Sequence, residues 1–186
     1  MKARTLLVLA ALAGGAAGCK PPPTDAAVAR VSLLTASGPS APLPSPDTTL
    51  AAWTSTANPL RLVYGEPGKP VLVALECIAP ATPEAQLRIT RHAPADEGAG
   101  ALLALIGNGR IGRFPVDATD FGGRALWQGE VSALLPEWDA LKPEREATVT
   151  VPGAGLVKLN PSPLPMQLVE ACRGEPDARD LPATPA

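Results

Sequence analysis

Short runs in which apolar and polar residues alternate occupy the middle of this chain, and turns containing glycine or proline separate them. In residues 60–64, the side chains of Leu62 and Tyr64 share one side of an extended backbone. Residues 71–78 and 87–91 alternate in the same way. Because successive side chains of a strand point to opposite faces, a period of two residues predicts half-buried strands rather than helices.

Glycine-containing turns then predict two hairpins. Asn108-Gly109 is the pair that type I′ turns prefer, because both central residues need positive φ, and Gly153-Ala154-Gly155 forms a second turn. The runs that flank these turns are residues 102–106 and 110–116, and residues 148–151 and 156–159. The other expected elements are a short strand at 125–128, a helix at 135–141 and a helix at 162–172 with Ser162 as N-cap and Pro163 at its first position. We therefore expect a mainly β fold: an antiparallel β-sandwich or half-open barrel of about seven short strands with one or two short helices.

Segments rich in proline border this part of the chain. Residues 19–57 consist largely of Pro, Ala, Ser and Thr, a composition that favours an extended, hydrated tether. Inside it, residues 28–34 are apolar and fit either a strand or a helical turn. Residues 174–186 combine prolines with alternating charges and predict a disordered tail. The globular domain is then expected at residues 58–173, which suffices for a single hydrophobic core.

The N-terminus has the features of an export signal. Lys2 and Arg4 precede an apolar stretch, residues 5–13, that is too short to span a bilayer, and small residues lead to Cys19. With its box Ala16-Ala17-Gly18-Cys19, this segment resembles bacterial lipoprotein precursors. The resemblance implies a signal peptide at residues 1–18, cleavage before Cys19 and lipidation of its thiol with acyl chains such as palmitate. Lys20 in place of Asp after the cysteine implies transport to the periplasmic face of the outer membrane.

An ordinary signal peptide is the alternative, since Ala16 and Gly18 also satisfy its small-x-small cleavage rule. The cysteine count favours lipidation, because three cysteines would leave an exported chain with one exposed thiol. Lipidation of Cys19 leaves Cys77 and Cys172, which are 95 residues apart. In an oxidising compartment we expect these two to form a structural disulfide.

Charge restricts the partners. Removing Lys2 and Arg4 from the 16 basic residues leaves 14 against 18 acidic ones, a net charge of about −4. Such a chain lacks the basic surplus that neutralises phosphates, so nucleic acid is not expected as a partner. The expected partners are the membrane, through the lipid anchor, and an envelope protein.

The sequence contains no motif that clearly indicates catalysis. The segment from Gly107 to Gly112 matches the Gly-x-Gly-x-x-Gly dinucleotide fingerprint, but Pro115 follows where that fingerprint requires a helix, so a hairpin turn is expected instead. His92 is the single histidine and is expected to be solvent-exposed beside a polar turn. Asp117 and Asp120 are expected in a solvated loop. No catalytic residues, metal ligands or cofactor are assigned, and the chain is expected not to be an enzyme.

Arginines gather in the middle strands, and one hypothesis is that they converge on one sheet face and bind an anion. The five residues are Arg88, Arg91, Arg110, Arg113 and Arg124. The competing interpretation is that they point outward from half-exposed strands and pair with acidic neighbours, namely Asp96, Glu97, Asp117 or Asp120. The three tryptophans, Trp53, Trp127 and Trp138, are expected in the core rather than on a sugar-stacking surface.

Two functions are consistent with these observations. The first is a lipid-anchored, non-enzymatic interaction or envelope-assembly module. The alternative is a periplasmic module that binds an anionic or glycan ligand through an arginine-rich sheet face. A flat, exposed apolar patch would favour the first, and a concave pocket lined by convergent arginines would favour the second.

Overall fold

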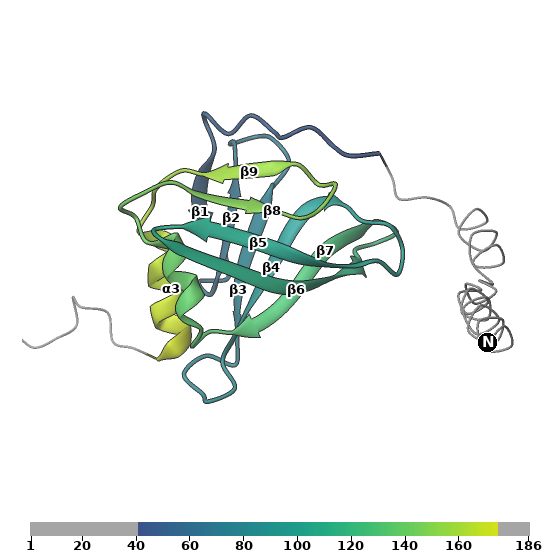
Figure 1. The fold of residues 1–186 in the computed structure, drawn as a ribbon. Coiled ribbons are helices and arrows are strands. Elements are labelled where there is room, and N and C mark those ends of the chain that lie inside the picture. Colours follow the sequence, from purple (N-terminus) through teal and green to yellow (C-terminus); the bar gives the residue numbers. More distant parts are fainter. Residues whose placement is uncertain (1–40, 175–186) are drawn as a thin grey trace, which may run out of the picture. The chain divides into compact units, whose positions relative to one another are not determined.

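A computed structural model describes residues 41–174, which contain nine strands, one 3-10 helix and one α-helix (Figure 1). The strands are β1 (Ala52–Ser55), β2 (Arg61–Gly65), β3 (Val73–Ile78), β4 (Gln86–Pro94), β5 (Gly100–Gly107), β6 (Arg110–Asp120), β7 (Ala125–Ser132), β8 (Ala147–Thr150) and β9 (Leu156–Leu159). The helices are η1 (Pro136–Leu141) and α3 (Leu164–Arg173).

All nine strands belong to one antiparallel sheet with the order β1-β2-β3-β4-β7-β6-β5-β8-β9. The sheet curls until it is nearly closed into a barrel, with α3 at one end (Figure 1). The predicted class, a mainly β antiparallel fold, is confirmed, and of the two expected architectures the half-open barrel is the observed one. The described part contains two strands more than the expected seven.

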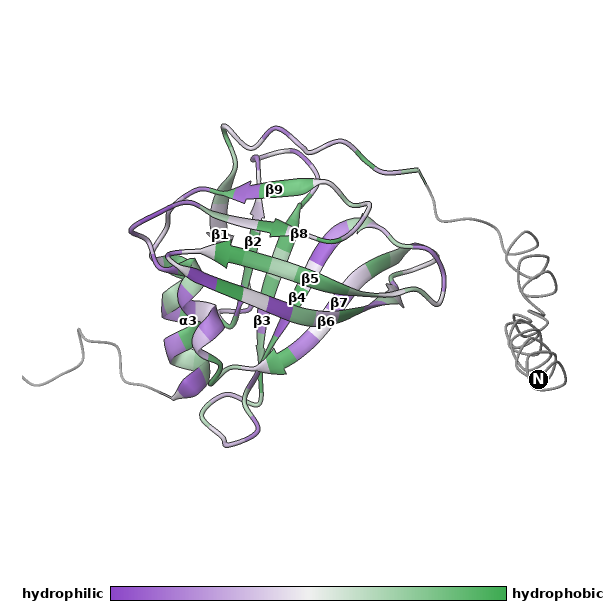
Figure 2. Cartoon of the chain, in the orientation of Figure 1, coloured by the Kyte–Doolittle hydropathy of each residue, from purple (hydrophilic) through white to green (hydrophobic). Residues whose placement is uncertain are grey.

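Alternation along the strands separates a barrel interior from an outer surface. In β4, Leu87 and Ile89 are fully buried and point inward, whereas Arg88 between them points outward. In β6, Phe114 and Val116 are buried, and the residues between and beside them are exposed. Figure 2 shows the resulting change of hydropathy along the strands. Burial of the inward residues is the main force that holds the barrel together.

The two edge strands, β1 and β9, do not pair through backbone hydrogen bonds. Side-chain hydrogen bonds instead connect the residues next to them. Asn160, directly after β9, donates from Nδ2 to the carbonyl oxygens of Thr48 (2.9 Å) and Ala51 (2.8 Å). Its backbone N–H donates to the hydroxyl of Tyr64 at 3.0 Å. Further along, the N–H of Leu156 donates to Oγ of Ser45 at 3.0 Å. Residues before β1 thus cover the edge of β9.

The predicted boundary between tether and domain is wrong, because β1 lies inside residues 19–57. Trp53 on β1 pairs with Tyr64 on β2, their ring centroids are 5.1 Å apart, and Trp53 is buried. Composition alone hid this strand, since its few apolar residues are surrounded by Thr, Ser and Pro. The apolar segment 28–34 and residues 175–186 of the predicted tail lie outside the described residues.

Helix α3 begins one residue later than expected, with Leu164 rather than Pro163 as its first helical residue. Its N-cap is Pro163 without a side-chain cap, although the N–H of Leu164 donates to Oγ of Ser162 at 3.3 Å. The helix ends at Gly174, whose φ of 75° is the left-handed conformation favoured by glycine at this position.

A disulfide joins α3 to the sheet. Cys77 on β3 and Cys172 on α3 are bonded, with their Cα atoms 5.5 Å apart. Both cysteines are buried, and the N–H of Ala81 donates to the carbonyl oxygen of Cys172 at 2.9 Å. The expected pairing is therefore present, and it closes a loop of 95 residues.

Candidate functional site

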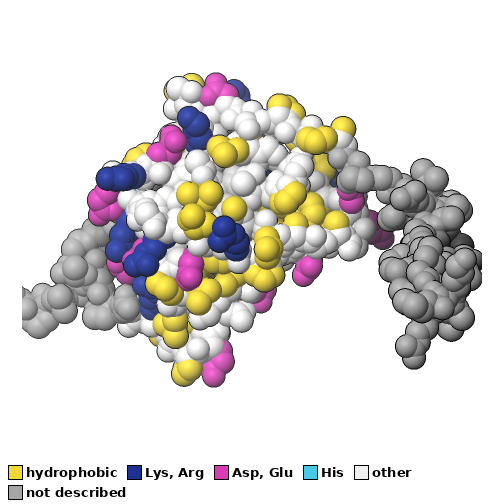
Figure 3. Space-filling model, in the orientation of Figure 1, with side chains coloured by type: hydrophobic (Ala, Val, Ile, Leu, Met, Phe, Trp, Pro, Cys, Tyr) yellow, Lys and Arg dark blue, Asp and Glu magenta, His cyan; other side chains and the backbone are white. Residues whose placement is uncertain are grey.

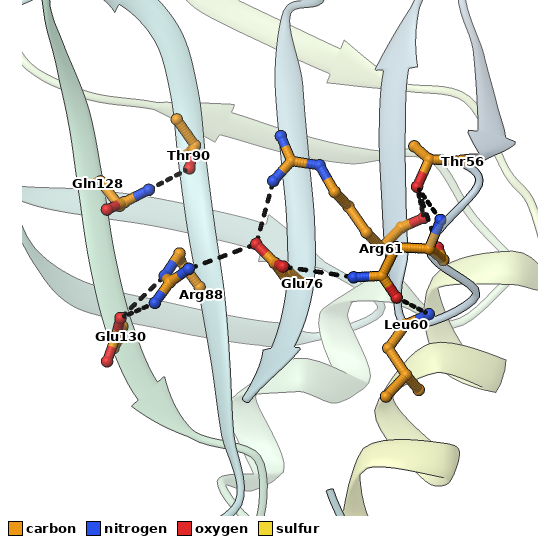
Figure 4. A network of polar contacts seen from close by, with 9 residues as sticks. Thr56, Leu60, Arg61, Glu76, Arg88, Thr90, Gln128 and Glu130 are labelled. Carbon is orange, nitrogen blue, oxygen red and sulfur yellow. Dashed lines mark hydrogen bonds and ion pairs between the residues drawn. The ribbon is translucent and has the colours of Figure 1, made fainter. Parts of the chain in front are cut away.

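The outer surface of β2, β3, β4 and β7 carries a row of charged side chains (Figure 4). Glu76 accepts from Arg61 at 3.0 Å and from Arg88 at 3.4 Å, and Arg88 also bonds Glu130 at 2.7 Å. Two arginines thus alternate with two carboxylates across four strands. Because the charges of this row compensate one another, Arg88 is not available as a free anion-binding group.

Arg91 does not share this face. It points into the barrel at the end of β4 farthest from Cys77 and is only 4% exposed. Its guanidinium donates to the carbonyl oxygens of Leu72 (3.1 Å) and Ala154 (2.8 Å), while the buried Nε has no partner within residues 41–174. Burial lowers the pKa of Arg91 to about 10, so the side chain remains charged at neutral pH. The expectation that it points outward and pairs with a carboxylate is wrong.

The other three arginines of the hypothesis lie apart from one another. Arg110 follows the β5–β6 turn and approaches Asp139 on η1 at 3.9 Å. Arg113 is exposed on the outer side of β6, and Arg124 is exposed just before β7. The five arginines therefore occupy the charged row, the barrel interior and three separate surface positions. Among these five arginines, Arg88 forms ion pairs with Glu76 and Glu130, and Arg110 forms one with Asp139.

The glycine-rich segment forms a hairpin, as predicted. Gly107 pairs with Arg110, and the two residues between them, Asn108 and Gly109, have φ values of 48° and 74°. The side chain of Asn108 donates to the carbonyl oxygens of Ala140 (3.0 Å) and Lys142 (2.7 Å) and so fixes the turn to η1. The strand β6 follows where a dinucleotide fingerprint requires a helix.

The glycines at the two ends of that segment serve packing. A Cβ at Gly107 would clash with the carbonyl oxygen of Ala140, and a Cβ at Gly112 would lie 2.6 Å from the ring of Phe114. Phe114 in turn packs on Trp138 of η1, with centroids 4.5 Å apart. The close approach of η1 requires glycine at position 107, and the packing of the Phe114 ring requires it at position 112.

The two aspartates lie within β6, which is longer than the predicted 110–116. Asp117 faces β7 opposite Gln128, and Asp120 ends the strand and accepts from the N–H of Gly123 at 2.9 Å. Within residues 41–174, no three His, Cys, Asp or Glu side chains gather as ligands of a metal ion would. All three tryptophans are buried, which confirms their expected place in the core.

His92 lies half-buried at the end of β4, so the expectation of a solvent-exposed histidine is wrong. It lines a pocket of about 440 Å³ together with Arg124 and a set of apolar and proline residues. The ring nitrogen Nε2 is buried and has no hydrogen-bond partner among the residues that the structure describes. Burial, and then the positive charges of Arg61, Arg91 and Arg124, lower the pKa of His92 below its ordinary value. Sequence reasoning missed this pocket because three separate segments form it.

The outer side of β5, β6, β8 and β9 differs from the charged row, because apolar side chains dominate it. We call the residues Leu102, Ile106, Ile111, Pro115 and Leu156 the apolar face. Cross-strand register places Leu102 opposite Pro115 and Ile106 opposite Ile111. Leu102 is 54% exposed, Ile111 51%, Ile106 43% and Leu156 36%. Figure 3 shows exposed hydrophobic side chains gathered on this side of the molecule.

The charged residues that share this outward register are Arg113 and Asp117 on β6 and Lys158 on β9. Arg113 lies opposite Ala104 in the register of β5 and β6, and no ion pair with it is present among residues 41–174. Lys158 lies at the border and approaches Glu146 at 4.0 Å. The apolar face is therefore a hydrophobic surface that surrounds the Arg113 guanidinium. Ile111, Arg113 and Pro115 also line a pocket of about 320 Å³ at its side.

Comparison with known proteins found no matching family model, no matching curated protein and no matching solved structure. In the described part of the chain, neither helix has the length and apolar character needed to cross a membrane.

Proposed function

We propose that this protein is a lipid-anchored, non-enzymatic interaction module of the bacterial cell envelope, and that it binds a protein partner through the apolar face. The single observation that carries the binding role is the exposure of Leu102, Ile106 and Ile111 side by side on adjacent strands. Contiguous apolar surface is uncommon on monomeric soluble proteins and marks interaction sites. The anchor is inferred from the lipoprotein-like N-terminus ending in Cys19.

A protein partner fits this surface better than a lipid bilayer does. The mature chain would carry a net charge of about −4, which opposes adsorption on an anionic lipid surface. Arg113 in the middle of the apolar face instead favours a partner that presents one carboxylate within an apolar patch. The partner is thus expected to be an envelope protein with an apolar, locally acidic docking surface.

Site-specific photocrosslinking in intact envelopes tests the partner. A photoreactive residue at position 102 should give one discrete protein adduct, and Ile106→Glu should reduce its yield at least about tenfold because a buried charge opposes docking. Leu134→Glu is the matched control, since Leu134 is 57% exposed but lies outside the apolar face. Equal adduct yields in both variants, or adducts with lipid alone, would show that the apolar face does not bind a protein.

Mass spectrometry tests the anchor separately. The mature protein should begin at an acylated Cys19, and Cys19→Ser should release a soluble periplasmic form or block processing. A free, unacylated Cys19 in the wild type would refute the proposed localisation at the outer membrane.

The alternative function, binding of an anionic or glycan ligand on an arginine-rich sheet face, loses its main support because the five arginines do not converge. Arg88 is committed to Glu76 and Glu130, and Arg91 is committed to backbone carbonyls inside the barrel. Arg124 and Arg113 line two separate pockets, of about 440 Å³ and 320 Å³.

A further inference from the structure

The pocket beside His92 lies on a different set of strands from the apolar face. Three segments form it: the residues just before β3, the end of β4 and the start of β7. Its apolar walls are Pro70, Val71, Pro94, Ala95 and Leu126. A volume of about 440 Å³ is in the range of small-molecule sites in proteins.

An irregularity of the sheet creates the pocket. The register of β4 and β7 shifts between Arg91 and Pro94, and bulges of this kind turn side chains away from their regular direction. The N–H of His92 donates to the carbonyl oxygen of Leu72 at 2.9 Å, and this bond holds β4 against the residues before β3. Pro70 and Pro94 restrict the backbone on both sides. The pocket walls are therefore held in place before any ligand binds.

The polar groups of the pocket are uncompensated. Nε2 of His92 has no hydrogen-bond partner in the described part of the chain, and buried polar groups in folded proteins are nearly always paired. The guanidinium of Arg124, at the rim, forms no ion pair within residues 41–174. The charges that act most on His92 are those of Arg61, Arg91 and Arg124, all of them cationic.

Apolar walls with one cation at the rim match a ligand that has an apolar body and a negatively charged group. We propose that this pocket binds a small amphiphilic carboxylate, whose negative group contacts Arg124 and whose apolar body packs against Val71 and Leu126. The ring of His92 forms part of the pocket wall and therefore senses whether the site is occupied. A phosphate or acetate ion lacks the apolar body, and a neutral alcohol lacks the charge, so neither uses both parts of the site.

Nuclear magnetic resonance tests this proposal directly, because His92 is the single histidine of the chain and its ring signals need no assignment. The full chain carrying Cys19→Ser, with its disulfide oxidised, would be titrated with octanoate, acetate and 1-octanol. Octanoate should shift the His92 ring signals in a saturable manner. Acetate and 1-octanol should bind at least about tenfold more weakly, since each satisfies only one part of the site.

Two variants make the test specific. Arg124→Gln should weaken octanoate binding at least about tenfold, whereas Arg145→Gln, which removes an exposed arginine just before β8, should leave it unchanged. Both positions are exposed, so both variants should fold. An absence of saturable His92 shifts, equal responses to all three probes, or equal weakening in the two variants would overturn the proposal.

Discussion

Removal of the Cys77–Cys172 bond should cost this domain a large part of its stability. The bond closes a loop of 95 residues, for which chain entropy predicts a contribution of about 4.7 kcal/mol. Domains of this kind are stable by only about 5–15 kcal/mol. The double substitution Cys77→Ala and Cys172→Ala should therefore leave a protein that unfolds under mild conditions. It should also loosen α3, because the disulfide is the covalent link between that helix and β3.

Urea unfolding followed by tryptophan fluorescence measures this effect. Trp53, Trp127 and Trp138 are all buried, so their emission should shift on unfolding. With a slope of about 2 kcal/mol per molar urea, a loss of about 4.7 kcal/mol lowers the midpoint by roughly 2 M. Reduction of the wild type should give the same shift, because it breaks the same bond without changing side-chain volume appreciably.

The matched control is Ala171→Ser, at an exposed position of α3 next to Cys172. It should change the free energy of unfolding by less than about 0.5 kcal/mol. If the double variant loses less than about 1 kcal/mol with an unchanged slope, the bond does not act by restricting the unfolded chain, and the reasoning from loop length is wrong.

Three further perturbations probe the barrel edge, the hairpin and the histidine. Asn160→Ala should lower the free energy of unfolding, measured by chemical denaturation, by about 1–3 kcal/mol. Asn160→Asp should lower it further, because a carboxylate would face the carbonyl oxygens of Thr48 and Ala51. Equal losses in the two variants would contradict the role of the amide. Gly109→Val should lower the free energy of unfolding by about 1–3 kcal/mol. Its φ of 74° is the only cause, since a Cβ at this position meets nothing within 4 Å. Gly109→Asn should cost clearly less, because asparagine tolerates positive φ, and similar losses in the two variants would argue against backbone strain. The pKa of His92 is lowered in the folded state from its ordinary value of 6.5. As the pH falls through this range the unfolded chain therefore binds more protons than the folded one, and the free energy of unfolding decreases. His92→Gln should make this decrease between pH 7 and pH 5 smaller, and a pKa of His92 at or above 6.5 in an NMR titration would contradict the prediction.

Several features of the fold could be read from short stretches of sequence, because short-range chemistry controls them. Residues 156–159 alternate in polarity and form β9 with the predicted bounds. Asn108-Gly109 forms the predicted turn, since positive φ at two successive residues is a local demand. The cysteine pairing followed from counting, once Cys19 was assigned to the lipid anchor. In the first two cases the deciding interaction lies within a few residues of the chain. In the third, only one pairing of the remaining cysteines is possible.

The candidate sites were beyond such reasoning, since they depend on which strands become neighbours. Alternation places Arg88 and Arg91, which are three residues apart, on opposite faces of a strand, but it does not show which face turns toward the core. The pairing of β4 with β7, rather than with β5, places Arg124 beside His92 and leaves Arg113 on another surface. The sequence by itself determined most of the strands, the hairpin turn and the partner of each core cysteine. Strand order, the buried state of Arg91, the pocket and the apolar face were decided by the tertiary structure, because closure of the sheet brings together residues whose separation in the chain carries no local signal.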